Sequence, residues 1–215
     1  LCCMERYVHG LIIRTYKHSL LEKLCSLSSI PIINALTDKY HPCQIMSDYM
    51  TIVEKFGDRK ITLSYLGDGF NIANSLLMLC SKLGYTLIMA TPKGFEPDQD
   101  VFSLSKEIAR KNGGTVVLTD DPQSAVSEAD IIYTDTWTSM GLEQEAQKRK
   151  TIFSRFQVND LLLEKAPSSA LIMHCLPAHR NIEISDTVLD GPQSIVFDQA
   201  ENRLHMQKAI ISELF

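Results

Sequence analysis

The clearest indication of architecture in this 215-residue sequence is Ser64-Tyr65-Leu66-Gly67-Asp68-Gly69-Phe70-Asn71-Ile72-Ala73. An apolar, strand-like run ends in a glycine-containing turn and passes directly into a helical pattern, as at the start of a βαβ unit. Similar runs recur along the chain and alternate with helical patterns, which predicts an α/β fold with a Rossmann-like parallel sheet and helices on both faces. The expected strands span residues 30–33, 61–66, 85–90, 115–118, 130–134, 170–173 and 194–197, and the expected helices span 18–27, 42–56, 71–83, 98–112, 142–149, 158–165 and 200–214.

A polar turn at residues 56–60 separates one long helical pattern from the first strong strand, and it predicts a domain boundary. We expect a larger domain at 58–197, the remnant of a second α/β domain at 1–57, and a final helix at 198–215 that returns to that second domain. Residues 1–17 resemble the interior of a domain, with a helical stretch through Tyr7-Val8-His9 and neither a start methionine nor a signal peptide. We therefore expect an N-terminally incomplete chain.

Composition indicates a globular protein: 45% of the residues are hydrophobic, 22% are charged, and the net charge is −5. No basic tract is present, so nucleic acid is not expected as a partner, and no apolar run reaches the ~18 residues that a membrane span needs. Six cysteines lack CxxC spacing, which argues for a reducing compartment and against a zinc site or a disulfide framework. We expect a cytoplasmic protein, or one of the mitochondrial matrix or plastid if the source is eukaryotic.

The glycine turn at residues 67–69 permits a dinucleotide interpretation, because glycines allow a ligand to approach backbone N–H groups. The fingerprint is incomplete, since Ile72 occupies the third glycine position and Ala90-Thr91 replace the acidic residue expected after the next strand. An ordinary tight turn is the alternative, and a NAD-dependent dehydrogenase would rest on this turn alone. Asn71 at the helix start could cap the helix or bind a ligand.

A thiol, two imidazoles and a guanidinium flank one proline in Met173-His174-Cys175-Leu176-Pro177-Ala178-His179-Arg180, directly after an apolar run. Cys175 is therefore expected at the carboxyl end of a strand, the edge at which open α/β sheets bind ligands. The alternative is a buried cysteine beside a packed histidine.

A second loop, residues 134–141, follows another expected strand at the same edge and carries Asp135, Trp137 and Ser139. Asp135 could pair with a cationic amine while Ser139 donates to a carboxylate, an arrangement suited to an amino-acid pocket. The alternative is a helix cap at Asp135 with Trp137 packed in the loop.

Two further groups lie at the starts of helices. His41-Pro42-Cys43-Gln44 opens the long helix, where an imidazole and an amide can polarise a carbonyl or orient an amide nitrogen. Glu201-Asn202-Arg203 begins the last helix. Capping and a solvated first turn are the respective structural alternatives.

Taken in order, five motifs resemble those of the ornithine carbamoyltransferases: His41-Pro42-Cys43-Gln44, Gly67-Asp68-Gly69-x-Asn71, Asp135-x-x-x-Ser139-Met140-Gly141, His174-Cys175-Leu176-Pro177 and Glu201-Asn202-Arg203. The resemblance extends over essentially the whole chain and includes Thr91–Pro97. Aspartate carbamoyltransferases are less similar, because they share the first motif but not the Ser-Met-Gly and His-Cys-Leu-Pro pair.

The resemblance implies an enzyme of arginine biosynthesis or the urea cycle in which the δ-amine of L-ornithine attacks carbamoyl phosphate, giving L-citrulline and phosphate. It implies a homotrimer in the complete protein and no metal or organic cofactor. By similarity, carbamoyl phosphate would be bound by Arg14, His41, Gln44, Cys175, Leu176 and Arg203. Ornithine would be bound by Asn71, Asp135, Ser139 and Met140, and the catalytic set would be Asp135, Cys175 and Arg203.

Two departures from the family pattern are visible. Phe70 stands where the family has a first asparagine, which alters the neighbour of Asn71. The family's phosphate-binding Ser-x-Arg-Thr-Arg motif is absent, and Arg14 matches a later arginine that precedes a tyrosine. We therefore expect these 215 residues alone to catalyse poorly or not at all. The alternatives are a non-catalytic ornithine-binding or regulatory fragment and a putrescine carbamoyltransferase, although Asp135 and Ser139 suit an amino acid better than a diamine.

Overall fold

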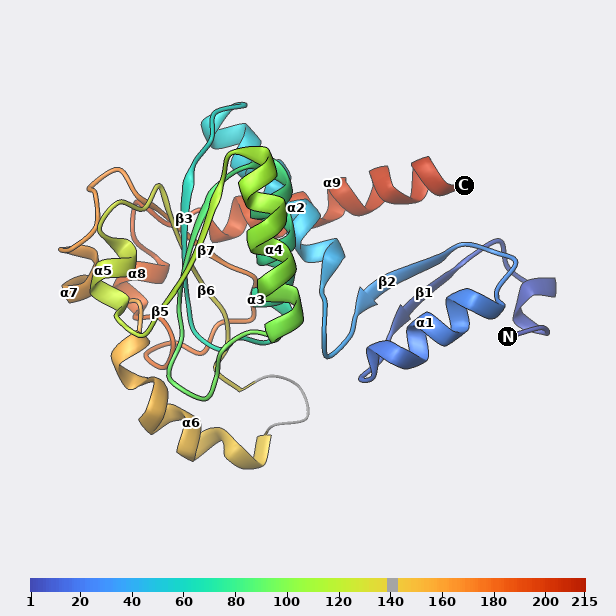
Figure 1. The fold of residues 1–215 in the computed structure, drawn as a ribbon, viewed down its shortest axis with the longest axis horizontal. Coiled ribbons are helices and arrows are strands. Elements are labelled where there is room, and N and C mark those ends of the chain that lie inside the picture. The colour runs from blue at the N-terminus through green and yellow to red at the C-terminus, as the bar shows by residue number, and fades with distance from the viewer. Residues whose placement is uncertain (139–142) are drawn as a thin grey trace.

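A computed structural model describes residues 1–138 and 143–215, and its centre is a five-stranded, entirely parallel sheet (Figure 1). The strands lie in the order β5-β4-β3-β6-β7. The chain runs from β3 through β4 to β5 at one edge and then crosses back to β6 on the other side of β3, so the topological switch point lies between β3 and β6. The predicted α/β fold with a Rossmann-like parallel sheet is thereby confirmed. The strands are β3 (Thr62–Leu66), β4 (Thr86–Ala90), β5 (Thr115–Thr119), β6 (Ile131–Thr134) and β7 (Leu171–His174).

Helices cover both faces of this sheet, because successive strand residues point to opposite sides and both sides are apolar. Leu63 and Tyr65 of β3 pack into one core and Leu66 into the other. The first face is covered by α2 (Pro42–Phe56), α3 (Asn71–Leu83) and α4 (Gln99–Asn112) (Figure 1). The second is covered by α5 (Pro122–Val126), α7 (Asp160–Leu163) and α8 (Asp186–Leu189).

A smaller unit precedes the sheet and consists of β1 (Leu11–Arg14), α1 (His18–Leu27) and β2 (Ile32–Leu36), with the two strands parallel. β1 is not among the expected strands. Its pairing with β2 shifts between Ile13 and Arg14, an irregularity that redirects the side chain at the end of the strand. The remaining elements are α6 (Ala146–Phe153), α9 (Val196–Leu214) and three 3₁₀ turns at Met4–Arg6, Glu143–Glu145 and Ser154–Phe156.

Two local predictions are wrong. Of the strand expected at 194–197, only the first half runs beside β7, where residues 193 and 195 make backbone hydrogen bonds to Ile172; α9 begins at Val196. A short apolar run does not distinguish a buried strand from a buried helix start. The helical stretch expected through Tyr7-Val8-His9 is absent, because the 3₁₀ turn ends at Arg6.

The last helix, α9, leaves the sheet and runs along α2. Asn202 Nδ2 donates to Thr51 Oγ1 at 3.0 Å and to Glu54 Oε2 at 2.6 Å, and Lys55 Nζ lies 2.5 Å from Asp198 Oδ2. The two helices thus form one connection between the large sheet and the smaller unit. The proposed domain limits, 1–57, 58–197 and 198–215, stay a prediction.

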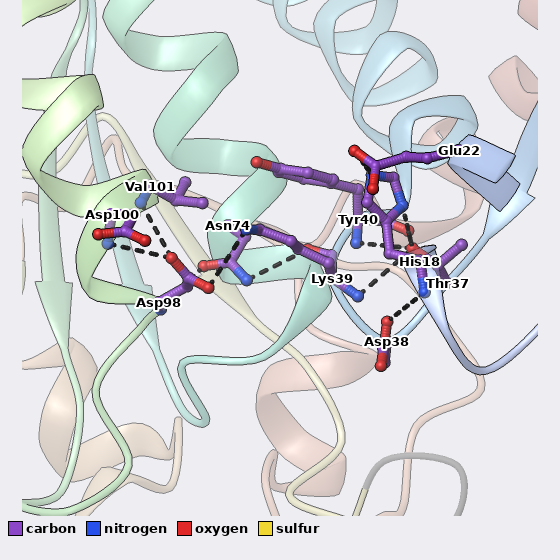
Figure 2. A network of polar contacts seen from close by, with 10 residues as sticks. All are labelled: His18, Glu22, Thr37, Asp38, Lys39, Tyr40, Asn74, Asp98, Asp100 and Val101. Atoms are coloured by element: carbon purple, nitrogen blue, oxygen red, sulfur yellow. Dashed lines mark hydrogen bonds and ion pairs between the residues drawn. The ribbon is translucent and has the colours of Figure 1, made fainter. Parts of the chain in front are cut away.

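The loop of residues 37–40 is held by both units (Figure 2). On one side, His18 Nδ1 lies 3.1 Å from Thr37 Oγ1. On the other, Asn74 Nδ2 of α3 donates to Lys39 O at 3.1 Å, and Lys39 Nζ lies 3.4 Å from Asp98 Oδ2 at the start of α4. Asn74 also accepts the backbone N–H of Asp98 at 3.2 Å. The residue that follows this loop is His41, so these contacts fix the entry to α2.

Replacement of Asn74 by alanine is expected to lower the free energy of unfolding by about 1–3 kcal/mol, because a buried amide that serves the two units is lost. Urea denaturation measures the change. Lys39→Met is the matched variant: it removes the partly exposed ion pair and an ammonium that lies 5.9 Å from the Tyr40 ring centroid, and it should cost no more than about 1 kcal/mol. A larger loss in Lys39→Met than in Asn74→Ala would show that the ion pair, and not Asn74, joins the units.

Candidate active site

Between the smaller unit and the carboxyl edge of the large sheet lies a pocket of about 240 Å³. Every predicted site residue that the structure describes lines it. Ser139 and Met140 lie outside the described residues. The predicted residues found at the pocket are Arg14, His41, Gln44, Asn71, Asp135, Cys175, Leu176 and Arg203.

Parallel strands end at one edge of a sheet, and this brings residues distant in sequence together. Asp135 directly follows β6 and Cys175 directly follows β7, while Asn71 opens α3 after β3. From the opposite side, the end of β1 supplies Arg14 and the start of α2 supplies His41. The pocket therefore has one wall from each unit.

Cys175 and Asp135 form a hydrogen-bonded pair, with the thiol Sγ donating to Asp135 Oδ1 at 2.9 Å. Burial, followed by the charge of Asp135, raises the pKa of the Cys175 thiol well above its usual value. Burial also raises the pKa of Asp135, although the hydrogen bonds from the thiol and from the N–H of Thr136 favour the carboxylate. Cys175 is thus held as a thiol and lacks the thiolate character of a nucleophile.

His174 shapes the loop that follows β7. It is completely buried, its Nε2 lies 3.1 Å from Glu183 Oε1, and its Nδ1 accepts the N–H of Leu176 at 2.9 Å. Because Nδ1 accepts, the ring proton resides on Nε2 and is donated to Glu183. Leu176 has a φ of 52°, so these bonds stabilise an unusual backbone turn beside Cys175.

His41 is buried, and its Nδ1 has no hydrogen-bond partner within the described part of the chain. Burial, with smaller contributions from the charges of Arg203 and Arg14, lowers the pKa of His41 to about 4. The side chain makes no capping hydrogen bond to α2, so the capping alternative does not account for it. A neutral imidazole next to two guanidinium groups can donate a hydrogen bond to a ligand carbonyl oxygen.

The depressed pKa of His41 has a consequence for stability. Between pH 6.5 and 4 the unfolded chain protonates this histidine and the folded chain does not, so stability falls as the pH falls. The contribution is about 3 kcal/mol at most. The free energy of unfolding, measured from pH 7 to pH 4, should show this loss in the wild-type chain and not in His41→Gln. His205→Gln, at an exposed position, should follow the wild type; wild-type and His41→Gln curves that stay parallel would contradict the assignment.

Arg203 reaches the pocket from α9 and donates through Nη1 to Gln44 Oε1 at 2.7 Å. Gln44 is buried, and its Nε2 donates to Asp48 Oδ1 at 2.8 Å. The alternative of a solvated first turn fits Glu201, which is exposed, but not Arg203.

Asn71 does not cap α3. It is the first residue of that helix, and its Nδ2 donates to Thr37 O at 2.8 Å across the two units. Phe70 also lines the pocket, so the departure from the family pattern lies at the site itself.

Several pocket residues were not predicted. Thr136, Thr138 and His179 lie in two segments that the sequence already predicts at the site, residues 134–141 and 173–180. Asp38 follows β2, where the same rule about strand ends could have found it. The further lining residues include Tyr16, Thr37, Asp38, Thr136, Thr138 and His179.

The backbone N–H groups of Gly67 and Gly69, in the turn after β3, donate to carbonyl groups of the chain itself. Gly69 N donates to Phe95 O at 2.9 Å, Gly67 N donates to Ala90 O at 3.1 Å, and a Cβ on Gly69 would lie 2.3 Å from the backbone of Glu96. Glycine is required here for close packing of the 92–97 loop. The dinucleotide interpretation therefore loses the feature on which it rested.

Among residues 1–138 and 143–215, no group of three or more His, Cys, Asp or Glu side chains is placed to hold a metal ion. None of the helices described is long and apolar enough to span a bilayer.

Guanidinium, imidazole and amide groups on one wall face a carboxylate–thiol pair on the other, within a two-unit α/β fold. Such a combination is suited to an anionic carbonyl compound and an amine, as in group-transfer enzymes. The chain belongs to the aspartate/ornithine carbamoyltransferase family. The family model of the carbamoyl-P binding domain matches residues 1–54 of the chain, and the family model of the Asp/Orn binding domain matches residues 59–214.

Individual relatives agree with this assignment. Ornithine carbamoyltransferase from Methanocorpusculum labreanum is 51% identical over 212 residues, covering 98% of this chain and 68% of the relative. The solved structure of ornithine carbamoyltransferase from Pyrococcus furiosus matches with a TM-score of 0.94 and 47% identity, covering 98% of this chain and 67% of that one. The structure from Gloeobacter violaceus has a TM-score of 0.92 and 46% identity, covering 99% and 72%. The predicted family is confirmed.

Proposed function

We propose that this chain binds carbamoyl phosphate and L-ornithine and transfers the carbamoyl group to the δ-amine of ornithine, giving L-citrulline and phosphate. One observation carries the proposal: a single pocket brings Arg14, His41, Gln44 and Arg203 opposite the Asp135–Cys175 pair. A relative from Pyrococcus furiosus is named an anabolic ornithine carbamoyltransferase, which favours a role in arginine biosynthesis.

The carbamoyl half of the reaction needs donors for the carbonyl oxygen, because negative charge grows on that oxygen in the tetrahedral intermediate. Arg14, Arg203 and neutral His41 supply them, and Arg14 also contacts the phosphate. Gln44 Oε1 and the backbone carbonyls of Cys175 and Leu176 are the acceptors that share the two hydrogens of the carbamoyl NH₂. These contacts orient the carbonyl carbon toward the amine.

The ornithine half needs a partner for each end of the amino acid. Asp135 faces the α-ammonium, whose charge offsets the burial that raises the pKa of this carboxyl. Asn71 faces the α-carboxylate; Ser139 and Met140, predicted for the same role, lie outside the described residues. Cys175 lies beside the δ-amine, which must lose a proton before it attacks. The thiol positions this amine and takes no covalent part.

Turnover by these 215 residues alone is expected to be slow. The sequence contains no Ser-x-Arg-Thr-Arg element, and the arginines that line the described pocket are Arg14 and Arg203. Each charge-assisted hydrogen bond to phosphate contributes about 1.5–3 kcal/mol. A citrulline assay with both substrates at millimolar concentration tests this, and turnover of about 10 s⁻¹, typical of enzymes, would contradict it.

Two alternatives remain distinguishable by binding. A putrescine carbamoyltransferase would bind putrescine at least as well as L-ornithine, whereas Asp135 favours the ligand that carries an α-ammonium. A non-catalytic ornithine-binding protein would bind ornithine and show no affinity for a carbamoyl phosphate analogue. We also propose that the protein forms a homotrimer, which sedimentation with and without ligand tests.

A further inference from the structure

Asp48 lies on α2, one turn after Gln44, and its side chain is completely buried. Its Oδ1 accepts from Nε2 of Gln44 at 2.8 Å and from Nε2 of Gln199 at 2.7 Å, and its Oδ2 accepts from the Tyr133 hydroxyl at 2.9 Å. Asp48 is not among the residues that line the pocket. Any effect on a ligand must therefore pass through the side chains that Asp48 holds.

The first of these is Gln44. Its Nε2 faces the Asp48 carboxylate, and its Oε1 accepts from Arg203 Nη1 at 2.7 Å. Only one orientation of the amide satisfies both neighbours, because the reverse would set oxygen against carboxylate and NH₂ against guanidinium. The amide oxygen has a second lone pair, so Gln44 offers the pocket an acceptor.

The second is Gln199 of α9. Its Oε1 accepts the backbone N–H of His174 at 2.9 Å, and His174 Nδ1 accepts the N–H of Leu176, also at 2.9 Å. These bonds hold the turn that carries the carbonyls of Cys175 and Leu176. One carboxylate thus connects acceptors on α2 with acceptors in the loop after β7.

We propose that Asp48 is a positioning residue that holds these acceptors for the NH₂ of the carbamoyl group, so that the site distinguishes a carbamoyl group from an acetyl group. The identity of the substrate rests on the proposed function. A methyl group in place of NH₂ would leave buried acceptors without a donor, and sites built to bond a donor reject analogues that lack it.

The test uses two phosphonates that differ only at this position: phosphonoacetamide, which carries NH₂, and 2-oxopropylphosphonate, which carries CH₃. NMR titration of the 215-residue chain gives both dissociation constants. The wild type should bind the amide at least about tenfold more tightly. Asp48→Leu, which removes the acceptor at similar volume, should reduce the preference to less than about threefold. Asp48→Asn keeps one oxygen for Gln44 and Gln199 and should keep the preference.

Gln199→Met cuts only the second connection and should give an intermediate preference. An unchanged preference in folded Asp48→Leu, checked by circular dichroism, would overturn the inference. If Asp48→Leu does not fold, an unchanged preference for the amide in Gln199→Met would overturn the inference. Equal binding of both phosphonates by the wild type would overturn the inference and leave the proposed function standing. Binding of neither phosphonate would overturn both.

Discussion

Replacement of Asp135 by asparagine is expected to weaken the binding of L-ornithine by about 100-fold. In the proposed complex this carboxylate is the partner of the α-ammonium in a buried site, and truncating one partner of such a pair costs about 2–5 kcal/mol. Asparagine retains the shape and an oxygen that can still accept from the Cys175 thiol, so the loss reports the charge. Calorimetric titration with L-ornithine measures it.

The specificity of this loss is checked with a ligand that lacks an amine. Phosphonoacetamide should bind Asp135→Asn and the wild type with similar affinity. Asp120→Asn, which removes a half-exposed carboxylate that does not line the pocket, should leave ornithine binding unchanged. Equal ornithine affinity in Asp135→Asn and the wild type would place the α-ammonium elsewhere.

Replacement of Arg203 by methionine should produce a loss of similar size for the other substrate. Arg203 supplies a guanidinium to the carbamoyl oxygen and also fixes Gln44 through the 2.7 Å bond to Oε1. Removal of both effects is expected to weaken phosphonoacetamide binding by about 100-fold, because a charge-assisted bond is lost and a buried acceptor is left unpaired.

Lys208→Met is the matched control on the same helix, at an exposed position outside the pocket. It makes the same change in charge and should leave the affinity for phosphonoacetamide unchanged. The affinity of Arg203→Met for L-ornithine should fall by much less than its affinity for the phosphonate. A loss of both ligands to the same degree would indicate general damage to α9.

The sequence predicts the sheet and most of the pocket because the information is local there. Each parallel strand shows as a short apolar run, and the residue after it lies at the common edge, so strand order along the chain is enough to place Asp135 and Cys175 together. The family resemblance adds Arg14 and Arg203 to the predicted site. No local pattern shows that these two residues lie near the strand ends.

What the sequence does not predict depends on contacts between distant residues. Gln199 bonds Asp48 across 151 positions, and Tyr133 bonds it across 85. The irregular end of β1 that precedes Arg14 arises from pairing with β2. The apolar run at 194–197 is divided, because α9 begins at Val196, whose side chain packs into the second core. Such features follow from tertiary packing and overrule local preference.

The central claim is that one pocket holds both substrates, and a ligand that joins their two halves tests it most directly. Nδ-(phosphonoacetyl)-L-ornithine carries the carbamoyl phosphate analogue on the δ-nitrogen of ornithine. Calorimetry should show one site per chain, at least about tenfold tighter than L-ornithine alone and weakened in both Asp135→Asn and Arg203→Met. Affinity no greater than that of L-ornithine, or affinity unchanged in both variants, would contradict the claim.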